Sequence, residues 1–485
     1  AVSTKVFAFN VMPLMTNIET VVLPAYGRIY GWEWINQVNK RLFDVFRHAY
    51  FILGNDIEDT IIGLKNNLEN IIELIKSPSI DSLRGRYNQQ PAIIVSAGPS
   101  LDKNIHTLKK AQGRALILAT DATLNVLARN GIVPDAVFSI ERGEVTYQAF
   151  YKDRDIDPAI TFIGPPVVRP EILDSIKGRK LLALKQGEAI NEWLNDLLGD
   201  NRMLLMGASC AHICFSFARH VGADPIIFVG QDLAYSEEGI THADGVEIKE
   251  QVNIDRERDK YLFVEGVNGK MLPTTPTLKN FLVWFEMEIA KDNSQRKYID
   301  ATEGGALIRG TELMTLERVI ELYCHKGITP LKDIIPAEND WLPVVQKVLA
   351  DLREKKEEFY NLRHKAGKHL LNLDKLENTV LNQDKLSAKA CEKLVKTLNK
   401  AAEVENMILR DRFISTFFQS LLMTTIARVK SLGNEIKENS LRENFQLQKK
   451  LFAGIVGGCF AIEEQISSII KDLEEKIALQ KGEVR

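Results

Sequence analysis

The sequence predicts an α/β protein, in which a Rossmann-like, mainly parallel central sheet lies between a mixed N-terminal segment and an all-helical C-terminal domain. The 485 residues are too many for one compact core. Short β-branched segments alternate with helical stretches between residues 91 and 330, which is typical of a parallel sheet covered by helices. Beyond residue 336 apolar residues recur every three or four positions, which predicts long helices. We therefore expect domains at residues 1–90, 91–330 and 331–485.

The N-terminal domain is expected to end in an amphipathic helix. Apolar residues spaced by three or four carry this prediction, namely Ile57, Ile61, Leu64, Leu68, Ile71 and Ile75. Asn55 or Asp56 can cap the start of the helix. The stretch SPSIDSLRGRYNQQP that follows is rich in turn-forming residues and predicts a linker.

Short β-branched segments predict the strands of the central sheet. They are Pro91–Ala97, Arg114–Thr120, Asp135–Glu141, Ala159–Gly164 and Pro225–Asp232, and each ends near a small or acidic residue. Another short strand is expected in YIDATEGGA, before Thr302. Helical stretches such as ATLNVLARNG and SCAHICFSFARHVG separate them. The segment Tyr261–Thr274 differs, because Asn268-Gly269 between two extended runs predicts a β-hairpin beside the sheet.

The C-terminal domain is expected to be a bundle or hairpin of long helices. Its first helix is indicated by Val345, Val348, Leu352, Phe359, Leu362 and Ala366 amid lysine and glutamate. Further helical runs cover residues 385–431 and 434–478. The charged outer faces are explained by contact with solvent, and binding of a partner is the alternative.

Composition limits the class of protein. The 62 basic and 65 acidic side chains nearly balance, so a broad basic surface for nucleic acid is not expected. The five cysteines are an odd number and form no C-x-x-C pair, which favours a reducing compartment. The apolar run Leu451–Ile462 is too short to span a bilayer, and the N-terminus lacks a basic signal-peptide start. We expect a cytoplasmic protein with no nucleic-acid or membrane partner.

Candidate binding residues follow the predicted strands, where an open parallel sheet binds its ligands. They are Ser96, Gly98, Pro99, Ser100, Asp102, Asp121, Ser139, Glu141, Gln231, Asp232, Tyr235, Thr241, His242, Thr302, Glu303, Gly304 and Gly305. Each has a simpler structural explanation: Ser100, Asp102 and Asp121 can cap helices, and the glycine pair can shape a turn. Five such loops at one sheet edge nevertheless favour a ligand cleft. His212, by contrast, is expected to be a core residue.

The stretch SAGPSLDKN suggests what this cleft binds. Glycines let peptide N–H groups approach an anion, and the start of a helix adds favourable partial charge. Neither a P-loop lysine nor a G-x-G-x-x-G motif is present, which argues against triphosphate chemistry. A donor with one phosphate and no divalent metal fits such a loop. The string Asp153-Arg-Asp155 matches the D-x-D metal motif of glycosyltransferases, but we interpret it as an acidic surface turn.

In these motifs the sequence resembles the motility-associated factor (Maf) proteins, flagellin glycosyltransferases with a sialyltransferase-like central domain. The motifs are SAGPSLDKN, TDAT, VGQDLAY…THADG and DATEGGALIRGTE, in that order. The resemblance covers nearly the whole chain and is strongest in residues 91–315. It implies a GT-A-like variant fold without the metal-binding D-x-D. It also implies transfer of a nonulosonic acid, pseudaminic or legionaminic, from its CMP-activated form to Ser/Thr hydroxyls of flagellin, in support of flagellum assembly and motility.

The resemblance further implies roles for individual residues. Sialyltransferases of similar fold use a histidine as general base and tyrosines near the leaving phosphate. By this analogy His242 deprotonates the acceptor and Tyr235 contacts the phosphate of CMP, with Asp232 as a third catalytic residue. The donor would be bound by Ser96, Gly98, Pro99, Ser100, Asp121, Glu141, Gln231, Thr302, Glu303 and Gly304. No metal and no cofactor besides the CMP-activated donor is expected.

Two other functions remain open. The GPSLD and DATEGG elements also resemble an archaeal family of hydroxymethylpterin diphosphokinases, which use ATP and Mg²⁺ and are much shorter. Alternatively, the chain is a chaperone-like factor whose long C-terminal helices pack against the helical ends of flagellin without catalysis.

Overall fold

The computed structural model describes residues 24–39, 56–254, 256, 260–381, 385–432 and 438–482. Contacts group the described residues into two compact units, one formed by residues 63–347 and the other by the residues before 63 together with those after 347. The expected divisions at residues 90 and 330 do not coincide with this grouping. The reason is that segments on both sides of the predicted central domain pack against its sheet.

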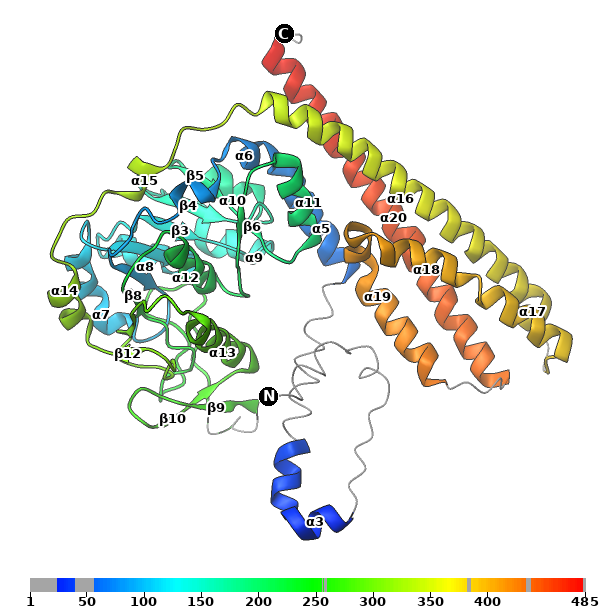
Figure 1. Ribbon diagram of the computed structural model, residues 1–485, viewed down its shortest axis with the longest axis horizontal. Coiled ribbons are helices and arrows are strands. Elements are labelled where there is room, and N and C mark those ends of the chain that lie inside the picture. Colours follow the sequence, from blue (N-terminus) through cyan, green and yellow to red (C-terminus); the bar gives the residue numbers. More distant parts are fainter. Residues whose placement is uncertain are drawn as a thin grey trace. The chain divides into compact units, whose positions relative to one another are not determined.

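An eight-stranded parallel sheet forms the centre of the unit of residues 63–347 (Figure 1). Its strands are β1 (Ala92–Val95), β2 (Leu116–Thr120), β3 (Ala136–Phe138), β4 (Thr161–Gly164), β5 (Lys180–Leu182), β8 (Ile226–Val229), β11 (Tyr298–Asp300) and β12 (Glu312–Leu313). The predicted parallel sheet and its predicted strands are confirmed. Strands β5 and β12 were not predicted.

The order of the strands is β12-β11-β8-β1-β2-β3-β4-β5. From β1 the chain first adds β2 to β5 on one side, and it then returns to place β8 on the other side of β1. The direction in which strands are added therefore reverses between β1 and β8. In open α/β sheets the crevice for ligands lies at this reversal, beyond the carboxyl ends of the two strands.

Two small sheets accompany the large one. Strands β9 (Leu262–Glu265) and β10 (Met271–Thr274) form the predicted antiparallel hairpin, with Gly269 in its turn at a positive φ of 76°. Strands β6 (Leu184–Lys185) and β7 (Met203–Leu204) form a short parallel pair that the sequence did not predict.

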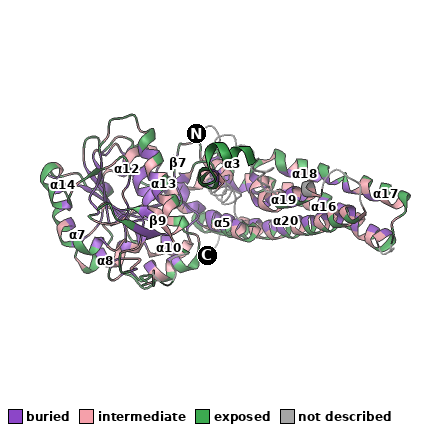
Figure 2. Cartoon of the chain, turned by 90° about the horizontal axis from the view of Figure 1, so that it is seen from below, coloured by how far each residue is buried: buried purple, intermediate pink, exposed green. Residues whose placement is uncertain are grey.

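Helices cover both faces of the large sheet. They include α6 (Ile71–Lys76), α7 (Leu101–Leu108), α8 (Leu124–Arg129), α9 (Glu144–Thr146), α10 (Pro170–Ser175), α11 (Ala189–Leu198), α12 (Cys210–His220), α13 (Pro276–Lys291), α14 (Leu316–Tyr323) and α15 (Leu331–Ile334). Alternate strand residues point to opposite faces, so Ile94 packs with α12 and α13 while Ile93 packs with α7, α8 and α14. The strands other than the edge strand β12 are accordingly buried on both faces (Figure 2).

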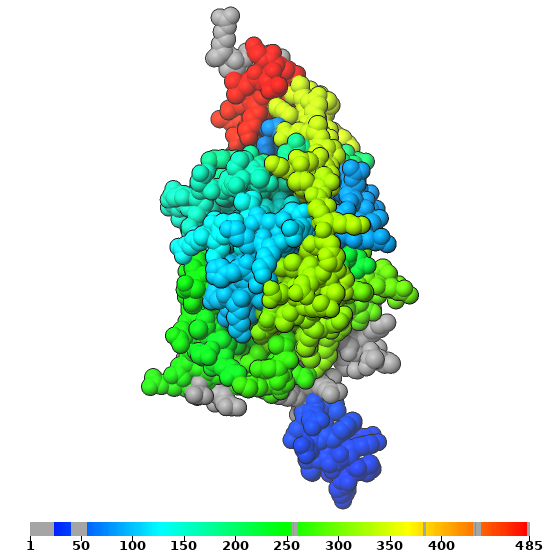
Figure 3. Space-filling view, turned by 90° about the vertical axis from the view of Figure 1, so that its left-hand side faces the viewer, coloured from blue at the N-terminus to red at the C-terminus, as the bar shows by residue number. Residues whose placement is uncertain are grey.

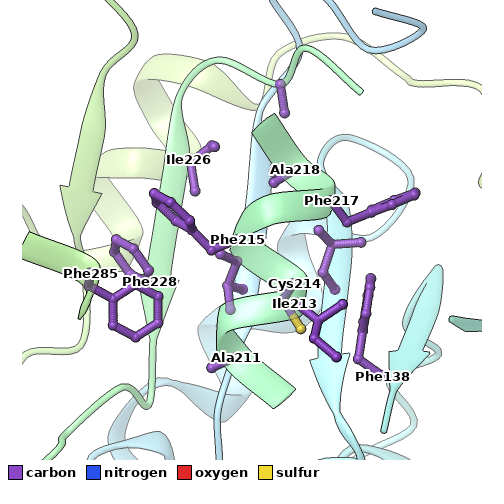
Figure 4. Close-up of a cluster of buried hydrophobic side chains, with 14 of the residues drawn as sticks. Phe138, Ala211, Ile213, Cys214, Phe215, Phe217, Ala218, Ile226, Phe228 and Phe285 are labelled. Carbon is purple, nitrogen blue, oxygen red and sulfur yellow. The ribbon is translucent and has the colours of Figure 1, made fainter. Parts of the chain in front are cut away.

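Aromatic rings fill the core on the α12 face of the sheet. Phe215 of α12 meets Phe285 of α13 with ring centroids 5.6 Å apart, and Phe228 of β8 meets the same ring at 5.2 Å (Figure 4). On the opposite face α7 and α14 pack side by side (Figure 3). Lys110, just after α7, pairs with Glu317 of α14 at 3.1 Å. This packing holds the ends of β1, β8 and β11 in place relative to α7.

The stretch SPSIDSLRGRYNQQP was wrongly predicted to be a linker. Its apolar residues Ile80, Leu83 and Tyr87 are buried in the core cluster on the α12 face, and residues Ile80–Leu83 form a 3₁₀ turn. The hydroxyl of Tyr87 donates a hydrogen bond to the carbonyl of Thr329 at 2.8 Å. Three apolar side chains therefore outweigh the turn-forming composition.

The predicted N-terminal helix is present as two helices, α5 (Ile57–Glu69) and α6. Asp56 caps α5, since its carboxylate accepts a hydrogen bond from the N–H of Asp59 at 2.8 Å, while Asn55 lies outside the described residues. The break falls at Asn70, whose amide donates to the carbonyls of Pro166 and Val168 at 2.9 and 2.8 Å. Of the rest of the predicted N-terminal segment, the described part includes α3 (Pro24–Tyr30).

The C-terminal residues form long helices, as predicted. These are α16 (Leu342–Leu376), α17 (Ala388–Leu398), α18 (Ala401–Arg410), α19 (Arg412–Ser431) and α20 (Glu438–Lys481), with buried and exposed residues alternating along each (Figure 2). Within the described chain, α20 has the length and composition of a helix that could cross a membrane. Core helices of soluble bundles share this property, and Phe445, Ile455 and Ile466 of α20 are buried inside the unit.

One ion pair in this unit is expected to contribute measurably to stability. Arg363 binds Glu463 through two hydrogen bonds of 2.6 and 2.9 Å, and only 10% of the Glu463 side chain is exposed. Arg363→Ala should lower the free energy of unfolding by about 1–3 kcal/mol, because it leaves a buried carboxylate without its partner. Arg353→Ala is the control, since its pair with Glu474 is 60% and 49% exposed and should contribute about 0–1 kcal/mol. Equal losses in urea denaturation would contradict this expectation.

Candidate functional site

The predicted loops after β1 and β8 meet where the strand order reverses. The hydroxyl of Ser96, just beyond β1, donates to the side-chain oxygen of Gln231, just beyond β8, at 2.6 Å. The N–H of Gly98 donates to the carbonyl of Gly230 at 2.9 Å. The two loops therefore form one structure at the position where this fold binds its ligands.

Asp232 lies at the centre of this structure. Its buried carboxylate accepts a short hydrogen bond of 2.6 Å from the hydroxyl of Ser100 and a longer one of 3.3 Å from the Ser100 N–H. Burial raises the pKa of Asp232 to about 6, although the bonds from Ser100 act in the opposite direction. Because Ser100 bonds to Asp232, its side chain does not cap α7.

Two glycines allow the loops to close around Asp232. A Cβ atom at Gly98 would lie 2.1 Å from the Oδ2 of Asp232, far closer than atoms can approach. Gly305 has a φ of 71°, and a Cβ there would lie 2.4 Å from the Cα of Asp232. The Cα of Gly98 therefore faces Asp232, and its N–H is bonded to the carbonyl of Gly230. This glycine shapes the site and does not offer its N–H to an anion, contrary to what the sequence had suggested.

The loop after β11 is tied to α7 and α14. The amide of Asn104 donates to the carbonyls of Ala301 and Thr302 at 3.2 and 3.0 Å, and Thr302 is fully buried. The carboxylate of Glu303 accepts the N–H of Leu316 at 2.9 Å, so it caps the start of α14. Gly304 follows directly and adjoins Ser100 and Asp232. Of the predicted residues Thr302, Glu303 and Gly304, it is Gly304 that lies next to Asp232 at the centre of the site.

His242 is held beside the end of β1 by main-chain hydrogen bonds. The N–H of the next residue, Ala243, donates to the carbonyl of Ala97 at 2.9 Å. The N–H of Asp244 donates to both carboxylate oxygens of Asp102 at 2.9 and 3.1 Å. Asp102 therefore positions the His242 loop through its carboxylate, a role that its expected capping of α7 did not include.

The hydrogen bonds around His242 define which ring nitrogen is free. Nδ1 lies 2.9 Å from the hydroxyl oxygen of Thr241, whose proton is donated to the carbonyl of Glu250 at 3.1 Å. With this arrangement we assign the ring proton of His242 to Nδ1, from which Thr241 accepts, and the lone pair to Nε2. Among the described residues, none hydrogen-bonds to this Nε2. Burial lowers the pKa of His242, with a smaller opposite effect of Glu250, so the ring is neutral at pH 7.

Tyr235 lies between the loops that follow β1 and β8, at the reversal of strand order, and the β9–β10 hairpin. Its N–H donates to the carbonyl of Pro273 at 2.8 Å, and its ring meets that of Tyr261 edge to face at 5.3 Å. Burial raises the pKa of Tyr235, so it remains a protonated phenol near neutral pH. A cavity of about 740 Å³ adjoins the hairpin, and its lining comprises Glu237, Glu238, Gln251, Val252, Asn253, Ile254, Phe263, Lys270, Met271, Leu272 and Pro273.

This cavity does not include the residues around Asp232. It nevertheless begins at Glu237, five residues after Asp232, in the same loop. Its volume falls within the usual range for small-molecule sites. No signal in the sequence pointed to it, because its walls come from residues that are distant in the chain.

Asp121 and Glu141 belong to a second polar group at the ends of β2 and β3. The buried carboxylate of Asp121 accepts hydrogen bonds from the hydroxyl of Ser139 at 2.7 Å and from the N–H of Ala122 at 2.9 Å. The thiol of Cys210, at the start of α12, lies 3.7 Å from the same carboxylate. Burial raises the pKa of Asp121 to about 6, and the exposed Glu141 raises it further. Sequence analysis did not assign Cys210 to this group.

Because the pKa of Asp121 is raised, replacing its carboxylate by a neutral amide should stabilise the fold, and the size of this gain should depend on pH. A carboxyl with a pKa of about 6 in the folded state and about 3.9 when unfolded stabilises the fold only while it is protonated, and this contribution is lost as the pH rises through 6. Asp121→Asn should therefore increase the free energy of unfolding at pH 8 by on the order of 1–3 kcal/mol. The increase should shrink towards pH 5. Asp155→Asn, at an exposed carboxylate paired with Lys177, should not produce it.

Two interpretations of other residues are confirmed. His212 is a core residue, with Nδ1 accepting the N–H of Ala208 at 3.0 Å and Nε2 donating to the carbonyl of Phe281 at 3.2 Å. Asp153-Arg-Asp155 is a surface turn, in which Asp155 pairs with Lys177 at 2.6 Å and is 87% exposed. In the part of the chain that the structure describes, no three His, Cys, Asp or Glu side chains are arranged to hold a metal ion.

The fold defines an α/β protein with a central parallel sheet, in which polar loops meet where the strand order reverses between β1 and β8. A family model described as 6-hydroxymethylpterin diphosphokinase MptE-like matches residues 65–238. Among solved structures, the chain is similar to a Maf glycosyltransferase from Magnetospirillum magneticum AMB-1, with a TM-score of 0.58 and 16% identity over 89% of this chain and 65% of that one. A search of curated proteins found no match. The predicted resemblance to the Maf family is thereby confirmed, and at this identity the structural likeness establishes the fold.

Proposed function

We propose that this protein is a glycosyltransferase that moves a nonulosonic acid, pseudaminic or legionaminic, from a CMP-activated donor to a Ser/Thr hydroxyl of flagellin. The observation that carries the proposal is the attachment of the His242 loop to Ala97 and Asp102, which flank the residues Gly98 and Ser100 that contact Asp232. The shared fold with a Maf glycosyltransferase supports the same reaction class. The five cysteines are free, in keeping with a reaction in the cytoplasm.

The two polar groups at the sheet edge suit the two ends of a nucleoside monophosphate. Neighbouring strands lie about 4.8 Å apart, so the Asp121 group at β2 and β3 is about 5–10 Å from the switch point at β1. This separation corresponds to the length of a nucleoside. The phosphate would lie near Ser100 and Gly304, and the cytidine would extend towards Asp121 and Glu141.

The transfer step assigns a task to each catalytic residue. The acceptor hydroxyl oxygen forms a bond to the anomeric carbon of the sugar, and the bond from that carbon to the phosphate oxygen breaks. The electron pair of the broken bond leaves with CMP, and the hydroxyl proton passes to Nε2 of His242. The phenol of Tyr235 can donate a hydrogen bond to the departing phosphate as negative charge develops there. Asp232 positions Ser100 through its short hydrogen bond.

Mass spectrometry of the acceptor tests the proposal directly. Purified protein is incubated with flagellin and CMP-pseudaminic or CMP-legionaminic acid, and the mass of flagellin is measured. We expect an increase by one or more nonulosonic acid residues, which is absent when the donor is omitted. Tight binding of flagellin without any mass increase would instead indicate the chaperone-like function.

A second candidate function is favoured by the family-model match, which covers β1 to β8. A hydroxymethylpterin diphosphokinase would transfer a diphosphate from ATP to the pterin alcohol. The match ends at residue 238, before the His242 loop, the β9–β10 hairpin and the C-terminal helices. The diphosphokinase function does not explain why the chain has these three parts. Formation of a diphosphorylated pterin from ATP, Mg²⁺ and 6-hydroxymethylpterin would contradict the glycosyltransferase proposal.

A further inference from the structure

A lysine of α7 lies at the open side of the Asp232 cluster. The Nζ of Lys103 donates a hydrogen bond to the carbonyl of Glu303 at 3.2 Å. A Cβ atom added to Gly304 would lie 3.7 Å from this Nζ, 3.1 Å from the Cβ of Ser100 and 3.6 Å from the Oδ1 of Asp232. Lys103, Ser100 and Asp232 therefore surround one point, which the missing side chain of Gly304 leaves free.

Carboxylates lie near this point, so an anionic ligand would need a nearby cation to offset their charge. The carboxylate of Asp232 lies beside it, and Glu237 and Glu238 follow in the same loop at the cavity. The side-chain hydrogen bond from Ser236 lowers the pKa of Glu238, and the charge of Lys103 acts in the same direction. The side chain of Lys103 is exposed, and the bond to Glu303 uses one of its three N–H groups.

The position of Lys103 in α7 is locally unfavourable. It is the third residue of the helix, where the positive end of the helix dipole favours acidic side chains by about 0.3–1 kcal/mol. Residues that break a local preference are expected at functional or strained positions. An anion bound at the start of α7 would reverse this unfavourable interaction, because it would lie between the dipole and the ammonium group.

We propose that Lys103 binds the phosphate of the CMP donor and positions it over Gly304. This inference rests on the proposed function and extends it, because it names the residue that replaces the lysine of a P-loop. The lysine comes from the first turn of the helix, five positions after Gly98, and the loop geometry brings it back over the site. A sequence search for a phosphate-loop motif does not detect this arrangement.

Binding of CMP and cytidine to three variants tests the inference. By isothermal titration calorimetry we expect Lys103→Met to bind CMP about 10- to 100-fold more weakly, the usual effect of losing a charge-assisted hydrogen bond, and cytidine unchanged. Lys103→Arg should recover most of the CMP affinity. Lys110→Met removes the same charge from an exposed site and should bind CMP like the wild type. Higher salt should weaken CMP binding more in the wild type than in Lys103→Met.

The outcomes separate this inference from the proposed function. If Lys103→Met binds CMP as tightly as the wild type, the role of Lys103 is overturned while the donor assignment stands. If Lys103→Met and Lys110→Met weaken CMP binding equally, the effect is one of general charge and the inference is also overturned. If the wild type binds neither CMP nor cytidine, the CMP donor itself is wrong, and the inference fails with it.

Discussion

Gly98→Ala is expected to lower the free energy of unfolding by about 3 kcal/mol or more and to abolish CMP binding. The new Cβ would lie 2.1 Å from the Oδ2 of Asp232 and 2.6 Å from the carbonyl oxygen of Gly230. The second contact is with backbone, so rotation of a side chain cannot relieve it. The loops after β1 and β8 would have to separate, and the short bond between Ser100 and Asp232 would be lost.

Gly143→Ala is the matched control for this variant. Gly143 follows β3 at the same edge of the sheet, has an ordinary φ of −78°, and has no atom within 4 Å of an added Cβ. Its replacement should change the free energy of unfolding by about 0.5 kcal/mol or less. Urea denaturation and CMP titration of both variants provide the measurement. Similar stability and CMP affinity of the two variants would show that the close approach of Gly98 to Asp232 is not required.

His242→Ala is expected to reduce the rate of transfer about 10²- to 10⁴-fold while CMP affinity stays within about twofold. The variant removes the proposed proton acceptor without touching the glycine-lined loops that we propose hold the phosphate. His242→Gln retains a polar side chain without a basic nitrogen and should be equally impaired. His106→Ala, at an exposed histidine of α7, is the control and should keep full activity.

The pH dependence of transfer provides an independent check on His242. Only the neutral ring can accept a proton, and burial lowers its pKa below the usual 6.5. The rate should therefore be constant from pH 8 to 7 and fall at lower pH with a midpoint below 6.5. The buried Asp232, with a pKa of about 6, titrates in the same range, so the profile must be compared with that of the His242 variants. Full transfer by His242→Ala would exclude this residue as the base.

The local pattern of the sequence was sufficient for most of the fold. The strands from β1 to β4, together with β8, β11 and the β9–β10 hairpin, follow from β-branched runs and one Asn-Gly turn. The C-terminal helices follow from the spacing of apolar residues. The stretch around Ile80, Leu83 and Tyr87 was misjudged, because turn-forming neighbours hid three core side chains.

The candidate site could be predicted as a set of loops but not as a structure. Parallel strands bring their carboxyl ends to one edge, so the residues after β1, β2, β3, β8 and β11 were expected to gather there. Local sequence could not show that Ser100 bonds to Asp232, which is 132 positions away. It also could not show that Glu303 caps α14 or that Asp102 holds the His242 loop.

The sequence by itself determined the type of most elements and the edge of the sheet at which chemistry is possible, because hydrophobic period and turn composition act over a few neighbouring residues. The tertiary structure decided which of the loops meet. It placed β8 beside β1, closed Gly98 onto Asp232, and brought Lys103 over Gly304. These contacts depend on strand order and close packing between distant segments, which no local pattern encodes. The loop SAGPSLDKN contains its own lysine, and only the packed sheet shows where that lysine lies.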